Sequence, residues 1–96
     1  MKTNYAFITK EEIQEATYLF LIDFIKTHTY ISTRVIITEI GRQFGFKRSH
    51  KDVIGKVFYT KLVRNIAPVI KILIESEQII RVKKGLYVKN TNNLNI

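Results

Sequence analysis

Seven basic side chains fall within residues 42–64, where Asp52 is the one acidic residue. The seven are Arg42, Lys47, Arg48, Lys51, Lys56, Lys61 and Arg64. Ammonium and guanidinium groups neutralise phosphates and release the counterions held around a polyanion, so this cluster favours nucleic-acid binding. The alternative is a solvated surface that keeps the protein soluble, which a composition rich in lysine and isoleucine would also produce.

The charge is divided unevenly along the chain, which has 96 residues and a formal net charge of +8. Residues 1–39 contain four basic and five acidic side chains, a net charge of −1. Residues 40–96 contain twelve basic and three acidic side chains, a net charge of +9. Because like charges at this density repel one another, a polyanionic partner would stabilise the second half.

We expect several single residues to make specific contacts with a DNA duplex. Ser49 and the free N–H groups of a helix beginning near it suit a phosphate. His50 suits a base edge or a phosphate, and Arg48 suits guanine O6 and N7 if it enters the major groove. Lys71 is a further contact if the last helix reads the bases.

Catalysis and metal binding find little support. The chain has no cysteine, which excludes disulfides and thiolate chemistry and makes a zinc site improbable. His28 and His50 have no partner at metal-ligand spacing. A Gly-rich phosphate loop and a Ser/His/Asp set are both missing. We therefore expect no enzyme, no cofactor and no metal.

The length suits one domain, and the 46% of hydrophobic residues suits a packed core. Asp23 interrupts the longest apolar run, at 18–25, so a membrane span is not expected, and the N-terminal residues lack the features of a signal peptide. We expect one domain over 1–96, with an arm at 1–8, a core at 9–90 and a flexible tail at 91–96. The expected location is the cytoplasm, on the nucleoid or, for a viral protein, in the host cell.

A first helix is predicted from residue 10 to about residue 27, because Thr9 and Glu12 form a capping box before an apolar run. Its second half, YLFLIDFI, is apolar nearly all round. A helix that is apolar on every side is buried on every side, and one small core cannot cover it. We therefore expect two copies to pair as a homodimer through Tyr18, Leu19, Leu21, Ile22 and Ile25.

Pro68 decides how the middle of the chain is divided. The segment HTYIST predicts a short strand, and Ser32 or Thr33 caps a helix over about 34–44 that Gly45 ends. In a helix interior a proline costs about 3 kcal/mol. With Asn65 as N-cap, Pro68 falls in a first turn instead. The prediction is therefore two helices, at about 50–63 and 66–77, and either is a candidate for base reading. The core face of the first is expected to hold Val53, Ile54, Val57, Phe58, Leu62 and Val63.

Residues 79–89 predict a β-hairpin. Ile80 and Val82 alternate with basic residues, and Lys84 and Gly85 form a turn in which glycine adopts positive φ. The basic residues Arg81, Lys83 and Lys84 suit phosphates or a minor groove. Lysines on exposed hairpins also prevent pairing of sheet edges, which is the other interpretation.

The order helix, short strand, helix, helix, helix, two-stranded ribbon resembles the winged helix-turn-helix family over residues 10–90. The stretches that carry the resemblance are TRVIITEIGRQFGF and NIAPVIKILIESEQIIRVKKGLYVKN. Within the second, LIESEQIIRVKKGLYV is similar to the family's passage from its last helix into the wing. The chain is also similar to the compact dimeric regulators of archaeal viruses and plasmids. It departs from the family in the twenty residues between Phe44 and Asn65, where the usual turn is short.

The resemblance implies a mainly α fold with a small β-hairpin (α+β) and sequence-guided binding of double-stranded DNA. The expected protein is a dimeric transcriptional regulator whose basic helix lies in the major groove while the wing and residues 42–64 contact phosphates. A dimer places two such helices about one turn of DNA apart. The alternatives are non-specific coating of DNA, as in segregation proteins, and a protein–protein interaction module that uses the same fold.

Overall fold

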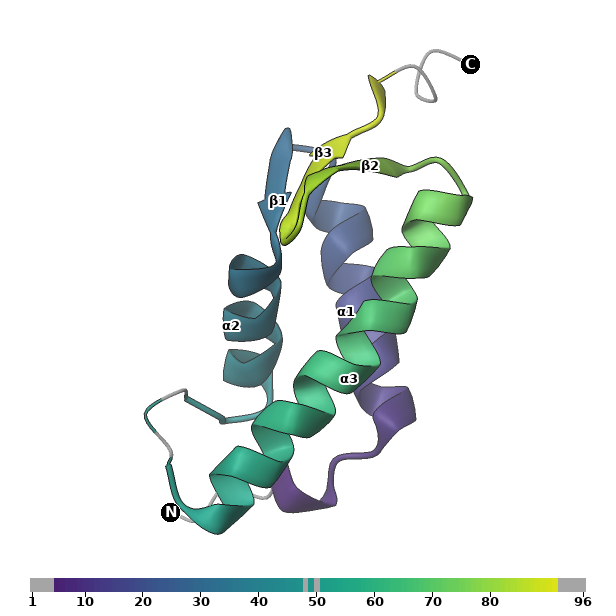
Figure 1. The fold of residues 1–96 in the computed structure, drawn as a ribbon. Helices are drawn as coiled ribbons and strands as arrows, with labels where there is room; N and C mark the ends of the chain where they lie inside the picture. The colour runs from purple at the N-terminus through teal and green to yellow at the C-terminus, as the bar shows by residue number, and fades with distance from the viewer. Residues whose placement is uncertain (1–4, 48, 50, 92–96) are drawn as a thin grey trace.

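The computed structural model describes residues 5–47, 49 and 51–91, and within them three α-helices pack with a three-stranded antiparallel sheet (Figure 1). The elements are η1 (Tyr5–Phe7, a 3-10 helix), α1 (Lys10–Phe24), β1 (Tyr30–Ser32), α2 (Thr33–Gln43), α3 (Val53–Glu75), β2 (Ile79–Lys83) and β3 (Leu86–Lys89). The predicted mainly helical α+β class with a hairpin is confirmed. The predicted tail beyond Thr91 and the first four residues of the predicted arm lie outside the described residues.

The capping box predicted for α1 is present. The Thr9 hydroxyl accepts a hydrogen bond from the Glu12 N–H at 3.1 Å, and the Glu12 carboxylate accepts one from the Thr9 N–H at 2.8 Å. The helix ends at Phe24, earlier than predicted, because the N–H groups of Lys26 and Thr27 bond three residues back in tighter turns. His28 then stacks on the Phe24 ring at 3.9 Å, which gives this histidine a structural role.

Helix α2 follows β1 directly, as the sequence predicts. The Ser32 hydroxyl accepts a hydrogen bond from the Val35 N–H, so Ser32 is the N-cap. Ile36, Ile37, Ile40 and Phe44 recur at helical spacing, which predicts a core stripe; the three isoleucines are buried and Phe44 is half-buried. Gly45 has φ +80° just past the helix end, which explains why glycine stands there.

One helix, α3, takes the place of the two helices that Pro68 predicts, so that prediction is wrong. Asn65 is not an N-cap, because its side-chain N–H donates to the Lys61 carbonyl at 2.9 Å while its oxygen accepts from Gln14 at 3.1 Å. Pro68 lies on the exposed side of the helix. The carbonyl that loses its N–H partner belongs to Arg64, which is also exposed. Water can therefore donate to this carbonyl in place of the missing N–H, which lowers the cost of the proline.

Burial on both sides of Pro68 explains why the helix continues. Phe58 and Leu62 before the proline and Val69 and Leu73 after it belong to one buried stripe. Each such side chain contributes about 1.5–3 kcal/mol when fully buried. Their sum exceeds the cost of about 3 kcal/mol for an interior proline.

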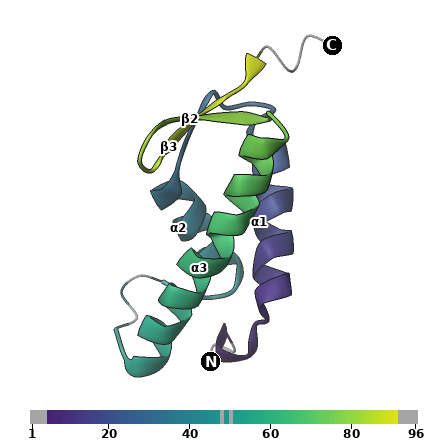
Figure 2. The same ribbon diagram turned by 45° about the vertical axis from the view of Figure 1, so that its right-hand side comes forward.

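The first two turns of α3 extend beyond the ends of α1 and α2 (Figures 1 and 2). Asp52 caps this end, since its carboxylate accepts from the Gly55 N–H at 2.9 Å. Val53, Ile54 and Val57 are exposed, contrary to their predicted place in the core. Their helical spacing is real, but η1 packs on the Phe58 side of this end of α3 and leaves these three side chains exposed.

The predicted hairpin is present and joins β1 in a sheet of order β1-β3-β2. Gly85 has φ +81° in the turn, as predicted. The Thr33 N–H donates to the Gly85 carbonyl at 2.9 Å, so the hairpin turn is held on the first turn of α2. An irregular register between Arg81 and Lys83 interrupts the outer strand, which makes this edge a poor template for pairing.

The core includes a residue from the predicted arm. Tyr5 is buried, with its ring 5.4 Å from the ring of Phe46 and 4.9 Å from that of Phe58. Gly41 allows this packing, because a Cβ there would lie 3.1 Å from the Phe46 ring. Tyr5 therefore belongs to the folded core, although the sequence predicts an arm over residues 1–8.

Substitution Pro68→Ala tests whether α3 is one helix. It restores an N–H donor for the Arg64 carbonyl and removes the proline ring, while the unfolded chain gains entropy that opposes part of the effect. We expect the free energy of unfolding to rise by about 2 kcal/mol in urea denaturation. An unchanged or lower stability would contradict a continuous helix.

Candidate nucleic-acid interface

Three elements meet beside the hairpin turn. A small hollow of about 140 Å³ lies between the start of α2, the middle of α3 and β3. It is lined by Thr33, Ile37, Val63, Ile66, Ala67, Ile70 and Tyr87. Pockets for small molecules are usually about 300–1,000 Å³, so this is a surface feature and not a ligand pocket.

Four exposed cations surround this hollow, and we call them the ribbon-side surface: Arg34, Lys71, Lys83 and Lys84. Arg34 follows Thr33 on the first turn of α2, and Lys84 precedes Gly85 in the turn bonded to Thr33. Lys71 lies one helical turn beyond Ala67. In the described part of the chain these four side chains make no ion pair.

A second hollow continues this surface along α2. It is lined by Ile37, Thr38, Arg42, Phe46 and Lys47, and shares Ile37 with the first. Arg42 and Lys47, both predicted to contact DNA, therefore lie along one side of the molecule with the ribbon-side surface. Arg42 is bound to Glu39 by two hydrogen bonds, of 3.0 Å from Nε and 2.7 Å from Nη2.

The bond to Arg42 changes the titration of Glu39. The guanidinium hydrogen bond holds the pKa of the Glu39 carboxyl below its usual value, against a smaller opposing effect of burial. The carboxylate in turn raises the pKa of Arg42. Because the pair is exposed to water, its effect on stability is small. The carboxylate occupies the Nε and Nη2 donors of Arg42, which are groups that can also donate to a phosphate.

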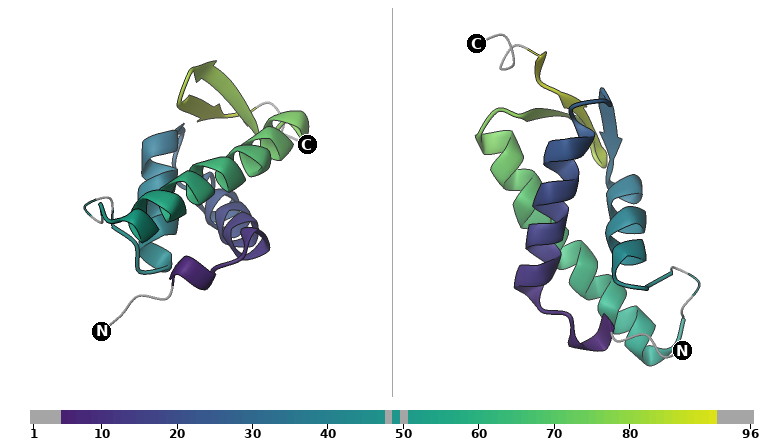
Figure 3. Two further views of the ribbon diagram at one scale, coloured as in Figure 1. Left: turned by 60° about the horizontal axis from the view of Figure 1, so that its bottom comes forward. Right: turned by 180° about the vertical axis from the view of Figure 1, so that it is seen from behind.

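The other side of α3 carries the next cations of the predicted cluster. Lys61 and Arg64 line an open groove with Lys10, at the start of α1. The Lys61 ammonium donates to the Ile8 carbonyl, so Lys61 holds the chain before α1 against α3. Figure 3 shows α3 lying between the ribbon and α1. The described cations of residues 42–64 are therefore divided between two sides of α3.

The start of α3 changes the expected role of Ser49. The N-cap is Asp52, and Ser49 lies in the loop before it. Because the Asp52 carboxylate already accepts from an N–H of the first turn, the predicted phosphate site at a helix beginning near Ser49 is not formed. Lys51 and Lys56 are exposed at this end, whereas Arg48 and His50 lie outside the described residues.

The ribbon contributes one more residue predicted to contact DNA, and the helix starts contribute two cations that were not predicted. Arg81 is exposed on the outer strand, opposite Tyr87. Arg34 and Lys10 were not predicted as contacts. The signal for Arg34 was its place directly after the HTYIST strand, but the pairing of that strand with β3 could not be inferred from spacing.

The predicted dimer surface is only partly available. Leu21 and Ile25 are buried in the chain's own core, so they have no surface left for a second copy. Tyr18 and Leu19 are exposed and Ile22 is half-buried. The apolar residues on nearly every side of the second half of α1 are thus explained mainly by packing within one chain.

Comparison with protein families, characterised proteins and solved structures finds no match for this chain. In the described residues, no helix is both long and apolar enough to cross a membrane.

Substitution Arg42→Ala tests the electrostatic pairing on α2. The folded-state pKa of Glu39 is lowered, so the pair's contribution to stability is present above the unfolded-state pKa and is lost as pH falls through the folded-state value. In the variant, the Glu39 carboxyl should titrate at a higher pH by carbon-13 NMR. Arg34→Ala, on the same helix, is the control and should leave the titration in place. Identical curves for wild type and Arg42→Ala would exclude the pairing.

Proposed function

We propose that the chain binds double-stranded DNA in a sequence-guided manner and acts as a dimeric transcriptional regulator. The observation that carries this proposal is the hydrogen bond from the Thr33 N–H to the Gly85 carbonyl. It holds Lys83 and Lys84 beside Arg34, so that cations from the ribbon and from α2 stand together next to the exposed side of α3. Exposed cations without ion-pair partners suit a phosphate backbone.

The exposed side of α3 suits the reading helix in this proposal. Ala67 and Lys71 fall along it beside the ribbon, one helical turn apart. Thr60 lies two turns before Ala67 on the same side and also lines the groove with Lys10. Small side chains such as alanine and threonine allow close approach to base edges and thymine methyl groups in the major groove. The two helices that were candidates for base reading are parts of the single helix α3. The middle of α3 adjoins the ribbon, so this part is the one proposed to read the bases.

The similarity to winged helix proteins supports the same arrangement, with β2 and β3 as the wing. In that arrangement Lys83 and Lys84 contact phosphates flanking the major groove or enter the minor groove. The cytoplasm, with the DNA, is the location that this function implies.

The dimer in this proposal forms through the exposed part of α1, namely Tyr18, Leu19 and Ile22. Exposed apolar side chains on one helix face support it. Two paired copies would place their α3 helices on successive turns of one duplex.

Salt-dependent binding to duplex DNA tests the function. Selection from a pool of random duplexes should enrich a motif, and affinity for that duplex should fall steeply with salt. Lys83→Ala/Lys84→Ala should lower the slope of log affinity against log salt by about 1–2. The matched control, Lys10→Ala/Lys26→Ala, removes the same charge elsewhere and should change the slope less. If binding is strong but the selection enriches no motif, the alternative of non-specific coating is indicated. If no complex is retained, DNA binding is excluded.

Sedimentation equilibrium tests the dimer. Leu19→Glu places a charge on the proposed interface and should yield monomers at concentrations where the wild type is dimeric. Ile80→Glu makes the same kind of change on an exposed residue of β2 and should leave the dimer intact. A monomeric wild type, or a dimer that survives Leu19→Glu, would rule out pairing through α1.

A further inference from the structure

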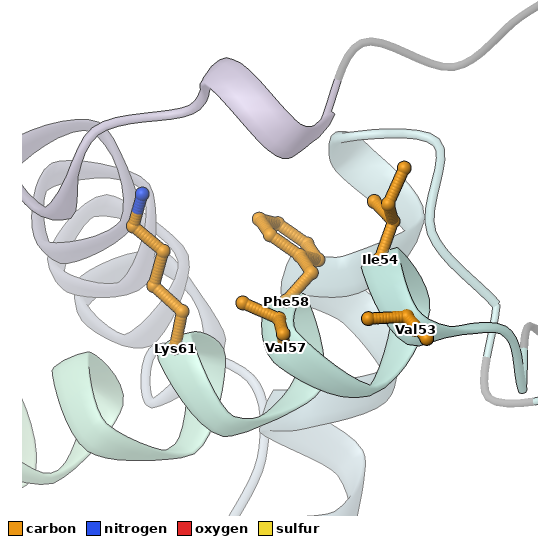
Figure 4. Close-up of a pocket in the computed structure, with 5 residues that line it drawn as sticks. All are labelled: Val53, Ile54, Val57, Phe58 and Lys61. Carbon is orange, nitrogen blue, oxygen red and sulfur yellow. The ribbon is translucent and has the colours of Figure 1, made fainter.

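The projecting start of α3 exposes aliphatic side chains that a soluble chain usually covers. Val53 is 77% exposed, Ile54 53% and Val57 62%. With Phe58 and Lys61 they line a hollow of about 190 Å³ (Figure 4). The hollow is below the roughly 300 Å³ at which small-molecule pockets begin, and suits one large side chain of another protein.

The apolar surface extends onto η1. Phe7 is 83% exposed and follows Tyr5, whose ring packs on Phe58. Val53, Ile54 and Val57 form what we call the α3-start surface, and Phe7 is exposed on η1, which packs against the same helix. Contiguous exposed apolar side chains of this kind mark interaction sites.

Positive charge adjoins the α3-start surface. The open groove that contains Lys10 and Arg64 shares Val57 and Lys61 with the hollow. Lys51 and Lys56 are exposed at the same end of α3. Neither hollow nor groove is lined by an acidic side chain, and the Asp52 carboxylate is engaged in capping α3. The charge that complements this surface is therefore negative.

The same charges disfavour a second copy of this chain as the occupant. A two-fold symmetric contact places the same patch on both sides, so the cations of one copy would face those of the other. A duplex would satisfy the cations but leave the aliphatic side chains and the hollow without an apolar partner. A bilayer is anionic and apolar, but its surface does not enter a hollow of this size.

We propose that the α3-start surface binds an acidic amphipathic helix of a partner protein. One large apolar side chain of that helix enters the hollow between Ile54 and Phe58, and a neighbour one turn away covers Val57. Carboxylates beside them pair with Lys10 and Arg64. This is recognition of a helix in a groove, with apolar anchors at i and i+4. Lys61 shapes the groove, because its ammonium is bound to the Ile8 carbonyl.

The partner site is centred on the start of α3, whereas the ribbon-side surface adjoins the middle of this helix. Its groove lies between α3 and α1, whereas the ribbon adjoins α3 on its other side (Figure 3). Because Arg64 and Lys71 are two turns apart on the same side of α3, a bound partner helix and a bound duplex would lie next to each other.

A designed peptide tests the proposal. The probe is a fluorescent helix of about 15 residues, with two leucines one turn apart and glutamates on the remaining faces. Fluorescence anisotropy should show binding that Val57→Glu weakens roughly tenfold or more. Ile72→Glu is the matched control, because Ile72 is 53% exposed on the same helix but lines neither hollow nor groove. A peptide with lysine in place of glutamate should not bind.

Four results would overturn the proposal. The first is no binding of the leucine–glutamate peptide up to about 1 mM. The second is equal binding by Val57→Glu, with Val53→Glu as a second variant should circular dichroism show that the first is unfolded. The third is equal binding by the peptide that carries lysine in place of glutamate. The fourth is a different occupant without peptide binding, seen as self-association or as binding to phosphatidylserine vesicles that Val57→Glu abolishes.

Discussion

The buried stripe of α3 is the constraint on which the rest of the structure depends. Phe58, Leu62, Ile66 and Leu73 are almost completely buried along one side of a 23-residue helix. The elements η1, α1, α2 and β2 all pack against this helix. A helix interior normally excludes proline. Pro68 is accommodated because the residues before and after it are buried along the same face of α3. Removing the stripe would remove the contacts that place these four elements.

A long central helix also divides the surface. On one side, the hairpin turn rests on the first turn of α2 and brings Arg34, Lys83 and Lys84 together. On the other, Lys10 and Arg64 share a groove with the exposed aliphatic start of α3. The two surfaces differ in chemistry, since the first presents cations around a shallow hollow and the second combines cations with exposed apolar side chains. We infer two kinds of partner from this division, a duplex and an acidic helix.

Features fixed by neighbouring residues could be predicted from the sequence. The caps at Thr9 and Ser32 and the positive φ of Gly45 and Gly85 follow from local geometry, and all four are present. Predictions that depended on distant contacts were less successful. The sequence shows what Pro68 costs but not what the flanking burial contributes.

The candidate site shows the same limit. Helical periodicity predicts that Val53 and Val57 belong to an apolar stripe. It does not show that the first turns of α3 extend beyond the ends of α1 and α2. The basic residues of 42–64 are close in sequence, but they belong to two helices, so Arg42 on α2 and Arg64 on α3 line different hollows. Pairing of β1 with β3, which gives Arg34 its place, joins residues more than fifty apart in the chain.

The most direct test of duplex binding through the ribbon-side surface is a nitrogen-15 NMR titration with the duplex selected from the random pool. The backbone amides of Arg34, Ala67, Lys71, Lys83 and Lys84 should shift, while those of Val53 and Ile54 should not. Shifts centred on Lys10, Lys61 and Arg64, or no shifts at low salt, would contradict this placement of DNA.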